Sequence, residues 1–217
     1  MKILDYLLDL LYPRRCFLCG RILRDFEKSC CKPCADGLDK LRAGEGRRDI
    51  NHVRLCVAPF IYKDSVRESL HRYKFRSAAA YAGVYAEFIA KSIDENRIFC
   101  DIISWVPLSK RRLRERGYDQ AELIARELAK ILGLECLPLL EKQRHNKAQS
   151  GLSGREARKA NAAGAYRCIA PEKLKDKTLL LVDDIVTTGA TLSECAAVLN
   201  RTGCKEIYAA AVATREL

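Results

Sequence analysis

The sequence from Thr178 to Thr191 is Thr-Leu-Leu-Leu-Val-Asp-Asp-Ile-Val-Thr-Thr-Gly-Ala-Thr. It contains a run of four apolar residues, too short for a helix, followed by two adjacent carboxylates, Asp183 and Asp184, and a turn of small residues. This order predicts a buried parallel strand, a loop and a helix. Similar strands alternate with helices along the rest of the chain, which indicates an α/β fold with a parallel sheet and helices on both faces.

The same stretch has the properties of a ligand site. In open α/β sheets, ligands bind at the carboxyl ends of strands, where backbone amides at a helix start can hold an anion. The small loop residues let those amides approach a phosphate, and carboxylates accept hydrogen bonds from sugar hydroxyls. The stretch therefore suits a phosphorylated ribose. The alternative is a strand capped by Asp and followed by an ordinary loop that binds nothing.

Positive charge is concentrated in one part of the chain. The net charge is +11, and residues 107–160 hold 13 Lys or Arg against 7 Asp or Glu. Five of the cations lie between Lys110 and Arg116, directly after the expected strand Asp101–Val106. This predicts an anion site at the carboxyl end of that strand. A charged loop that binds nothing is the alternative.

A second basic stretch, from Lys142 to Arg158, has almost no apolar side chains apart from Leu152. A loop of that length is uncommon and is usually an active-site lid or a disordered linker. A lid would exclude water and complete the site on closing. We therefore expect a lid, with the linker as the alternative.

Five of the eleven cysteines fall between residues 16 and 34. Cys16 and Cys19 form one Cys-x-x-Cys pair, and Cys31 and Cys34 form a second, which predicts four thiolates around a structural zinc ion. A redox dithiol pair and ordinary buried cysteines are the alternatives. Cys30 could replace Cys31, although only Cys31 has the two-residue spacing to Cys34.

The N-terminus gives no sign of export. Met1 to Leu11 has apolar residues at helical spacing but no cleavage site after them, so we expect an amphipathic helix rather than a signal peptide. No apolar run approaches the roughly 20 residues of a membrane span. A reducing cytoplasm is the expected location. Residues 1–50 would form a small zinc-knuckle module with a linker over 35–52, and residues 51–217 the main domain.

Two segments resemble known proteins. Residues 178–191 closely resemble the phosphoribosyl pyrophosphate loop of type I phosphoribosyltransferases. Residues 107–120 are similar to a Val-Pro-Leu, Arg-rich, Arg-Gly-aromatic-Asn-Gln signature of the ComF family, which comprises competence-associated, phosphoribosyltransferase-like proteins. Asp119 stands where that family usually has Asn, and Ser109-Lys110 where His-Pro is common. The family's lid is also similar in its spacing to Arg144, Gln149, Leu152, Arg158 and Asn161.

The resemblance implies a role for each group of residues. Residues 51–217 would form a type I phosphoribosyltransferase-like core, in which Asp183 and Asp184 are catalytic and contact the ribose hydroxyls. The 5′-phosphate would bind Thr187, Thr188, Gly189, Ala190 and Thr191. Candidates for the pyrophosphate loop are Ser109, Lys110, Arg111 and Arg116. The lid candidates are Arg144, Lys147, Gln149 and Arg158.

The resemblance also implies an activity. We expect a glycosyltransferase that moves phosphoribose from phosphoribosyl pyrophosphate to an unidentified acceptor and releases pyrophosphate, with Mg²⁺ bound through the substrate, in a context of competence and natural transformation. The rival hypothesis is a non-enzymatic competence factor that keeps this pocket, binds single-stranded DNA and works with the competence machinery. Aromatic side chains are few in the basic segment, essentially Tyr118, which weakens the case for base stacking there.

Overall fold

The computed structural model of the chain describes residues 13–38, 47–75, 79–143 and 164–215, and the statements below concern these ranges. The expected helix at Met1–Leu11 lies outside them. Within them, no helix is both long enough and apolar enough to cross a membrane.

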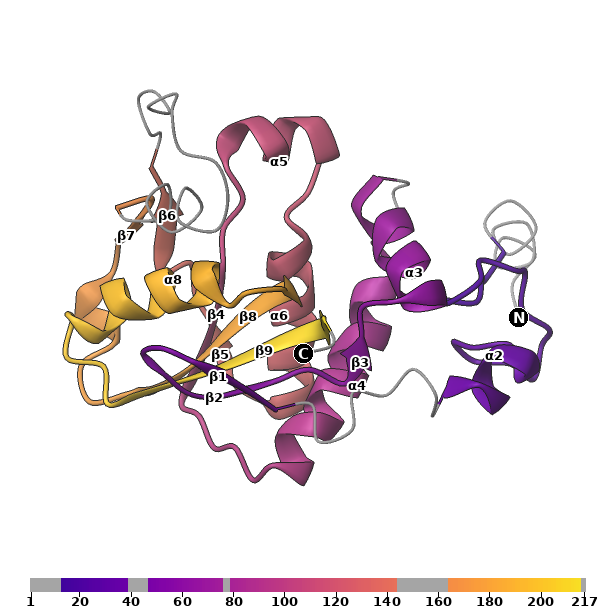
Figure 1. Ribbon diagram of the computed structural model, residues 1–217, viewed down its shortest axis with the longest axis horizontal. Helices are drawn as coiled ribbons and strands as arrows, with labels where there is room; N and C mark the ends of the chain where they lie inside the picture. Colours follow the sequence, from indigo (N-terminus) through magenta and orange to yellow (C-terminus); the bar gives the residue numbers. More distant parts are fainter. Residues whose placement is uncertain (1–12, 39–46, 76–78, 144–163, 216–217) are drawn as a thin grey trace.

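A seven-stranded sheet forms the centre of the molecule (Figure 1). Its order is β1-β2-β9-β8-β4-β5, and β3 also pairs with β9. All pairings are parallel except that of β1 with β2 at one edge. The parallel strands run in the same direction, so their carboxyl ends all lie at the same end of the sheet. The strands are β1 (Arg47–Ile50), β2 (Val53–Val57), β3 (Phe60–Ile61), β4 (Ile102–Trp105), β5 (Glu135–Cys136), β8 (Thr178–Val186) and β9 (Glu206–Thr214).

Successive side chains along a strand point to opposite faces of the sheet. Both faces of this sheet are apolar, and helices cover both. Leu180 and Val182 of β8 point into a core shared with α4 (Tyr81–Glu95) and α6 (Gln120–Leu132). Leu179 and Leu181 point to the opposite face and pack with α8 (Ala190–Asn200). All four leucine and valine side chains are fully buried, as expected of a central parallel strand. The expected α/β fold is confirmed.

The central strand is longer than its apolar run. Ile185 and Val186 still pair with Ala213 and Thr214 of β9, so β8 continues past the two aspartates. Asp183 and Asp184 are therefore the sixth and seventh of the nine residues of the strand and do not lie in a loop. Asp183 pairs with Ala211 of β9, and Asp184 lies between this pair and that of Ile185 with Ala213, so the sheet positions both carboxylates.

Two local expectations were wrong. Residues 47–50 belong to the segment expected to be a linker, but they form β1 and pair with β2. The strand expected over Leu134–Leu140 is interrupted, and its parts are β5 and β6 (Leu140–Lys142). In contrast, the expected end of α6 at Gly133 is confirmed, because that glycine is left-handed and caps the helix.

A separate two-stranded sheet stands beside the main one. It pairs β6 with β7 (Tyr166–Cys168) in antiparallel fashion, and the Gln143 amide donates to the Ala165 carbonyl over 2.8 Å. These two strands flank residues 144–163. The described ends of the expected lid segment are thus held next to each other.

The cysteine-containing segment packs directly on the main core. Phe17 contacts the rings of Phe60, Tyr85 and Phe88, with centroid distances of 5.6–6.3 Å. The Phe17 carbonyl accepts hydrogen bonds from Ser69 and Arg72, both on α3 (Asp64–Phe75). The segment therefore shares one hydrophobic core with the helices α3 and α4. Figure 1 shows it beside α3.

Candidate functional site

A cleft of about 190 Å³ opens at the carboxyl end of β8. Its walls come from the end of α3, the short helix α5 (Lys110–Arg116), the start of α6, the β6–β7 pair and the start of α8. Segments far apart in the sequence therefore meet at the place predicted for a ligand. Its charged lining residues include Lys74, Arg112, Arg116, Lys142, Asp183 and Asp184.

The two aspartates have different partners. Asp184 forms an ion pair with Lys74, with 2.7 Å between Oδ2 and Nζ, and both side chains are more than four-fifths buried. Asp183 accepts a hydrogen bond from the Asp184 amide at 2.8 Å. Burial, together with the negative charge of Asp184, raises the pKa of Asp183 to about 8. At neutral pH Asp183 therefore holds a proton and can both donate to and accept from a sugar hydroxyl.

The predicted phosphate loop lies beside these carboxylates. Thr187 and Thr188 are exposed, Thr191 lines the cleft, and Gly189 caps the N-terminus of α8 with φ +73°. The first-turn amides of α8, which lack helical partners, thus lie at the cleft. The loop has the small residues that an anion site needs, and the Ala190 amide donates a long hydrogen bond of 3.4 Å to the Thr188 hydroxyl.

Strand β1 supports this loop from outside the cleft. Arg48 donates from Nη2 to the carbonyls of Thr187, at 3.4 Å, and Arg215, at 2.8 Å. The Ile50 side chain lies where a Cβ on Gly189 would stand, only 2.9 Å away. We did not predict either contact, because both residues lie in or beside the segment expected to be a linker.

The arginine-rich segment is a helix, and this decides which of its cations face the cleft. Ser109 accepts a hydrogen bond from the Arg112 amide and caps α5. Lys110 lies 3.8 Å from Glu141, and Arg111 pairs with Glu115 at 2.8 Å on the exposed side. Of the four predicted pyrophosphate residues, only Arg116 lines the cleft.

Arg112 also lines the cleft, and we did not single it out as a site residue. Residues four apart share one side of a helix, so helical spacing from Arg116 would have identified it. Lys74 was likewise not among the predicted site residues. No local pattern marks it, because its partner Asp184 is 110 positions away.

Two further groups complete the walls. Asp119 accepts hydrogen bonds from the amides of Leu108, Ala121 and Glu122, so it caps α6 and anchors the loop after β4. Lys142 donates to the Tyr166 hydroxyl at 2.8 Å. The pKa of Lys142 is lowered, mainly by burial and secondly by the positive charge of Arg112. These residues join the flanks of the expected lid to the cleft. The lid candidates themselves, Arg144, Lys147, Gln149 and Arg158, lie outside the described residues.

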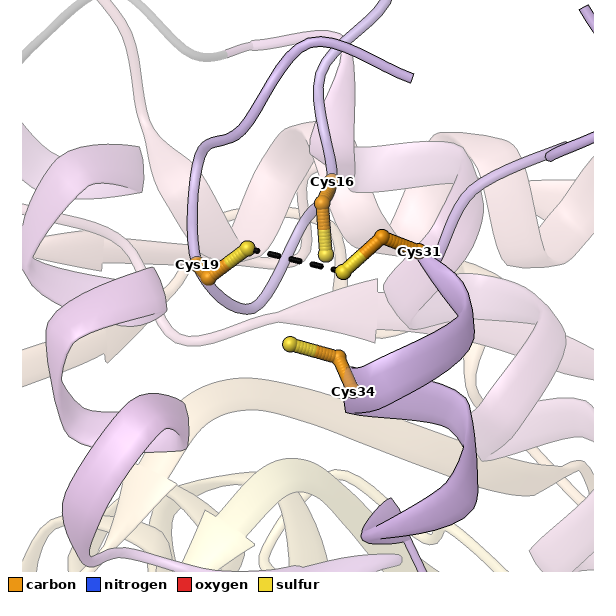
Figure 2. A group of neighbouring side chains, drawn as sticks. All are labelled: Cys16, Cys19, Cys31 and Cys34. Atoms are coloured by element: carbon orange, nitrogen blue, oxygen red, sulfur yellow. Dashed lines mark hydrogen bonds between the residues drawn. The ribbon is translucent and has the colours of Figure 1, made fainter. Parts of the chain in front are cut away.

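The four predicted zinc ligands form a cluster. The Sγ atoms of Cys16, Cys19, Cys31 and Cys34 all lie within 4.8 Å of one another (Figure 2). A tetrahedral zinc with bonds of about 2.3 Å holds its sulfurs about 3.8 Å apart, and Cys19 and Cys31 are already 3.7 Å apart. Cys30 is not part of this group, although its Sγ lies 3.9 Å from that of Cys16.

The cluster fits a zinc ion chemically as well. Burial and the neighbouring thiols raise the pKa of Cys34 above its usual range, because several thiolates cannot crowd together without a cation. Soft sulfur donors select zinc among the common divalent ions. Four sulfur ligands would leave no coordination position for a substrate, so such an ion would have a structural role.

Comparisons with known proteins agree with this fold. The phosphoribosyl transferase domain family matches residues 119–216. Competence protein ComFC of Streptococcus pneumoniae is 29% identical over 150 residues, covering 69% of this chain and 64% of that protein. Competence protein F of Haemophilus influenzae is 34% identical over 104 residues, or 47% and 45% of the two chains. The aligned regions thus span less than two thirds of these two relatives.

A third relative is matched over a larger share of both chains. DNA utilization protein YhgH of Salmonella typhi is 28% identical over 200 residues, covering 88% of this chain and 86% of that protein.

Proposed function

This chain belongs to the ComF family of competence-associated, phosphoribosyltransferase-like proteins, and we propose that it binds phosphoribosyl pyrophosphate in the cleft at the end of β8. One observation supports this ligand above others. The cleft has paired carboxylates on β8, helix-start amides beside them and two arginines on α5 opposite. These three groups match the hydroxyls, the 5′-phosphate and the pyrophosphate of a single molecule.

We propose further that the protein transfers phosphoribose to an acceptor. Loss of pyrophosphate leaves a cation-like ribose carbon, so catalysis depends on positioning and on stabilising charge as it develops. Asp183 and Asp184 would orient the ribose. The negative charge of Asp184 would favour that carbon, and Asp183 would add its own charge once the bound ligand lowers its pKa. Arg112 and Arg116 would neutralise the leaving group. Mg²⁺, for which carboxylate and phosphate oxygens are suitable ligands, would screen the pyrophosphate charge when bound. A cytoplasmic location is part of this proposal, because reducing conditions keep the thiols available for zinc.

Replacing both aspartates by asparagine tests the ligand assignment. Hydrogen bonds to charged groups contribute about 1.5–3 kcal/mol each, so we expect the double variant to bind phosphoribosyl pyrophosphate at least tenfold more weakly in calorimetry with magnesium. Asp94→Asn, an exposed residue on α4, is the matched control and should bind as the wild type does. An absence of binding by the wild type, or equal binding by the double variant, would contradict the proposal.

The same titration has a second readout. Asp183 has a pKa of about 8 in the protein without ligand, and hydroxyl donors or Mg²⁺ beside it would lower that pKa by favouring the carboxylate. Binding at pH 7 should therefore release protons. Titrations in buffers of different ionisation enthalpy would detect the release, and Asp183→Asn should abolish it.

Arg112 and Arg111 provide a matched pair for the pyrophosphate end. Arg112→Ala removes a cation from the cleft, so we expect about tenfold weaker binding of inorganic pyrophosphate and little change for ribose 5-phosphate. Arg111→Ala removes an equal charge from the exposed side of the same helix and should change neither. Calorimetry with the two probes measures this. Equal effects of the two variants would mean that only overall charge matters.

Single-stranded DNA binding is a second candidate, and the surface of the cysteine segment favours it. Six cations between Arg14 and Lys32 are exposed, and Phe26 among them is 74% exposed, so it can stack on a base. We expect a labelled oligonucleotide to bind with an affinity that falls steeply with salt, and Phe26→Ala to weaken binding further. Fluorescence anisotropy measures both, and binding that is insensitive to salt would exclude this candidate.

A further inference from the structure

The C-terminal end of α3 places an exposed aromatic ring next to the cleft. Lys74 lines the cleft, and Phe75, the next residue, is 60% exposed. An aromatic side chain stabilises a fold chiefly when it is buried, so Phe75, most of which is exposed, contributes little to the core. Pockets for small molecules typically combine aromatic surfaces with a few polar groups, as this end of the cleft does.

The Phe75 ring is part of a series of planar groups that leads from the surface into the cleft. The His71 ring lies on one side of it, with 4.9 Å between centroids, and the Arg116 guanidinium carbon lies 5.1 Å from its centroid. Arg116 also lines the cleft and donates to the Gln120 side chain at 2.6 Å, which fixes the guanidinium plane. A further planar group would find stacking surfaces already in place.

This end of α3 is held in position by contacts from three sides. The Tyr73 hydroxyl donates to the Gln120 carbonyl at 2.9 Å, and the Tyr118 hydroxyl donates to the Tyr73 carbonyl. Lys74 is paired with Asp184. The last turn of α3 is therefore attached to α6 and to β8, so the ring has a defined place relative to the carboxylates. Such pre-organisation reduces the entropic cost of binding.

From these contacts, and on the basis of the proposed function, we infer that the end of α3 is the acceptor side of the cleft. The acceptor is a planar aromatic ring, of nucleobase size, that stacks on Phe75 beside Arg116. The phosphate loop and α5 hold the two phosphate ends of the donor, and the α3 end is a further wall of the same cleft. Lys74 would orient the ring through an oxygen or ring nitrogen.

Ligand binding to the protein loaded with phosphoribosyl pyrophosphate and magnesium tests this inference. The probes are uracil, adenine and benzoate, with cyclohexanecarboxylate as a match for benzoate in charge and ring size but not in planarity. Base–aromatic stacking is worth about 1–3 kcal/mol, so Phe75→Ala should bind at least one planar probe about 5- to 140-fold more weakly. Phe75→Trp should retain that binding. Saturation-transfer NMR and calorimetry measure both effects.

Phe99→Ala is the control, because Phe99 is 80% exposed and precedes β4 at the opposite edge of the sheet. It should bind every probe as the wild type does. If the wild type fails to bind phosphoribosyl pyrophosphate, the proposed function fails. If it binds this ligand but no planar probe, or if Phe75→Ala binds the probes equally well, only the acceptor inference is overturned. Equal binding of benzoate and cyclohexanecarboxylate would also overturn it.

Discussion

Replacement of Cys34 by serine is expected to abolish zinc binding and to destabilise the whole domain, with a loss on the order of 3 kcal/mol or more. Structural zinc contributes about 10–16 kcal/mol of apparent binding energy in small zinc modules, and one lost sulfur removes a large part of it. The effect should reach beyond the cysteine segment, because Cys16, Phe17 and Leu18 are buried in the core shared with α3 and α4. Metal content and thermal unfolding measure the two losses.

Cys30→Ser is the matched control. Cys30 lies next to the cluster but outside the group of four, so this variant should keep one zinc per chain and an almost unchanged melting temperature. A strong chelator should lower the melting temperature of the wild type and of Cys30→Ser, but not that of Cys34→Ser. Stoichiometric zinc in Cys34→Ser, or none in the wild type, would refute the assignment of the ligands.

Gly189→Ala is expected to destabilise the domain by about 1–3 kcal/mol and to disturb the phosphate loop. The left-handed φ of +73° costs an alanine roughly 1 kcal/mol or more. In addition, the new Cβ would lie 2.9 Å from the Ile50 side chain, so β1 or the loop must shift. Denaturant unfolding measures the stability, and phosphate-competition calorimetry measures the loop.

Two variants separate the causes of this effect. Gly83→Ala lies on α4 with open space around it and ordinary backbone angles, so it should stabilise the protein by up to about 1 kcal/mol. Ile50→Ala removes the Cγ1, Cδ1 and Cγ2 atoms that the new Cβ would meet, so in a double-mutant cycle Gly189→Ala should lose the steric part of its cost in the Ile50→Ala background but keep the part due to φ. Full recovery would show that the backbone conformation costs nothing, contrary to our expectation.

Much of the site could be predicted from the sequence, because it lies in one short segment. The apolar run, the two aspartates and the small-residue loop are contiguous, and each defines local structure over a few residues. The two Cys-x-x-Cys pairs are likewise local, because the spacing within each pair is enough to predict that both sulfurs face one tetrahedral site. In the structure Asp183, Asp184 and Thr191 line one cleft, and the four cysteines form one cluster.

The sequence was less informative where a side chain's direction depends on packing. Five cations between Lys110 and Arg116 predict a charged segment, yet only the helical form of α5 separates Arg112 and Arg116 from Arg111. Composition resembling a linker concealed β1, because a short polar edge strand has no apolar alternation of its own. Its identity depends on pairing with β2.

By itself, therefore, the sequence determined the class of fold, the place of the carboxylate pair and of the small-residue loop, and the cluster of four cysteines. Only the tertiary structure decided that Lys74 pairs with Asp184, that Ile50 excludes any side chain at Gly189, and that Phe75 stands beside the cleft. The physical reason is the number of residues that separates the interacting positions along the chain. Periodicity and spacing act over a few neighbouring residues, whereas these contacts join positions up to 139 apart and exist only once the sheet and its helices have packed.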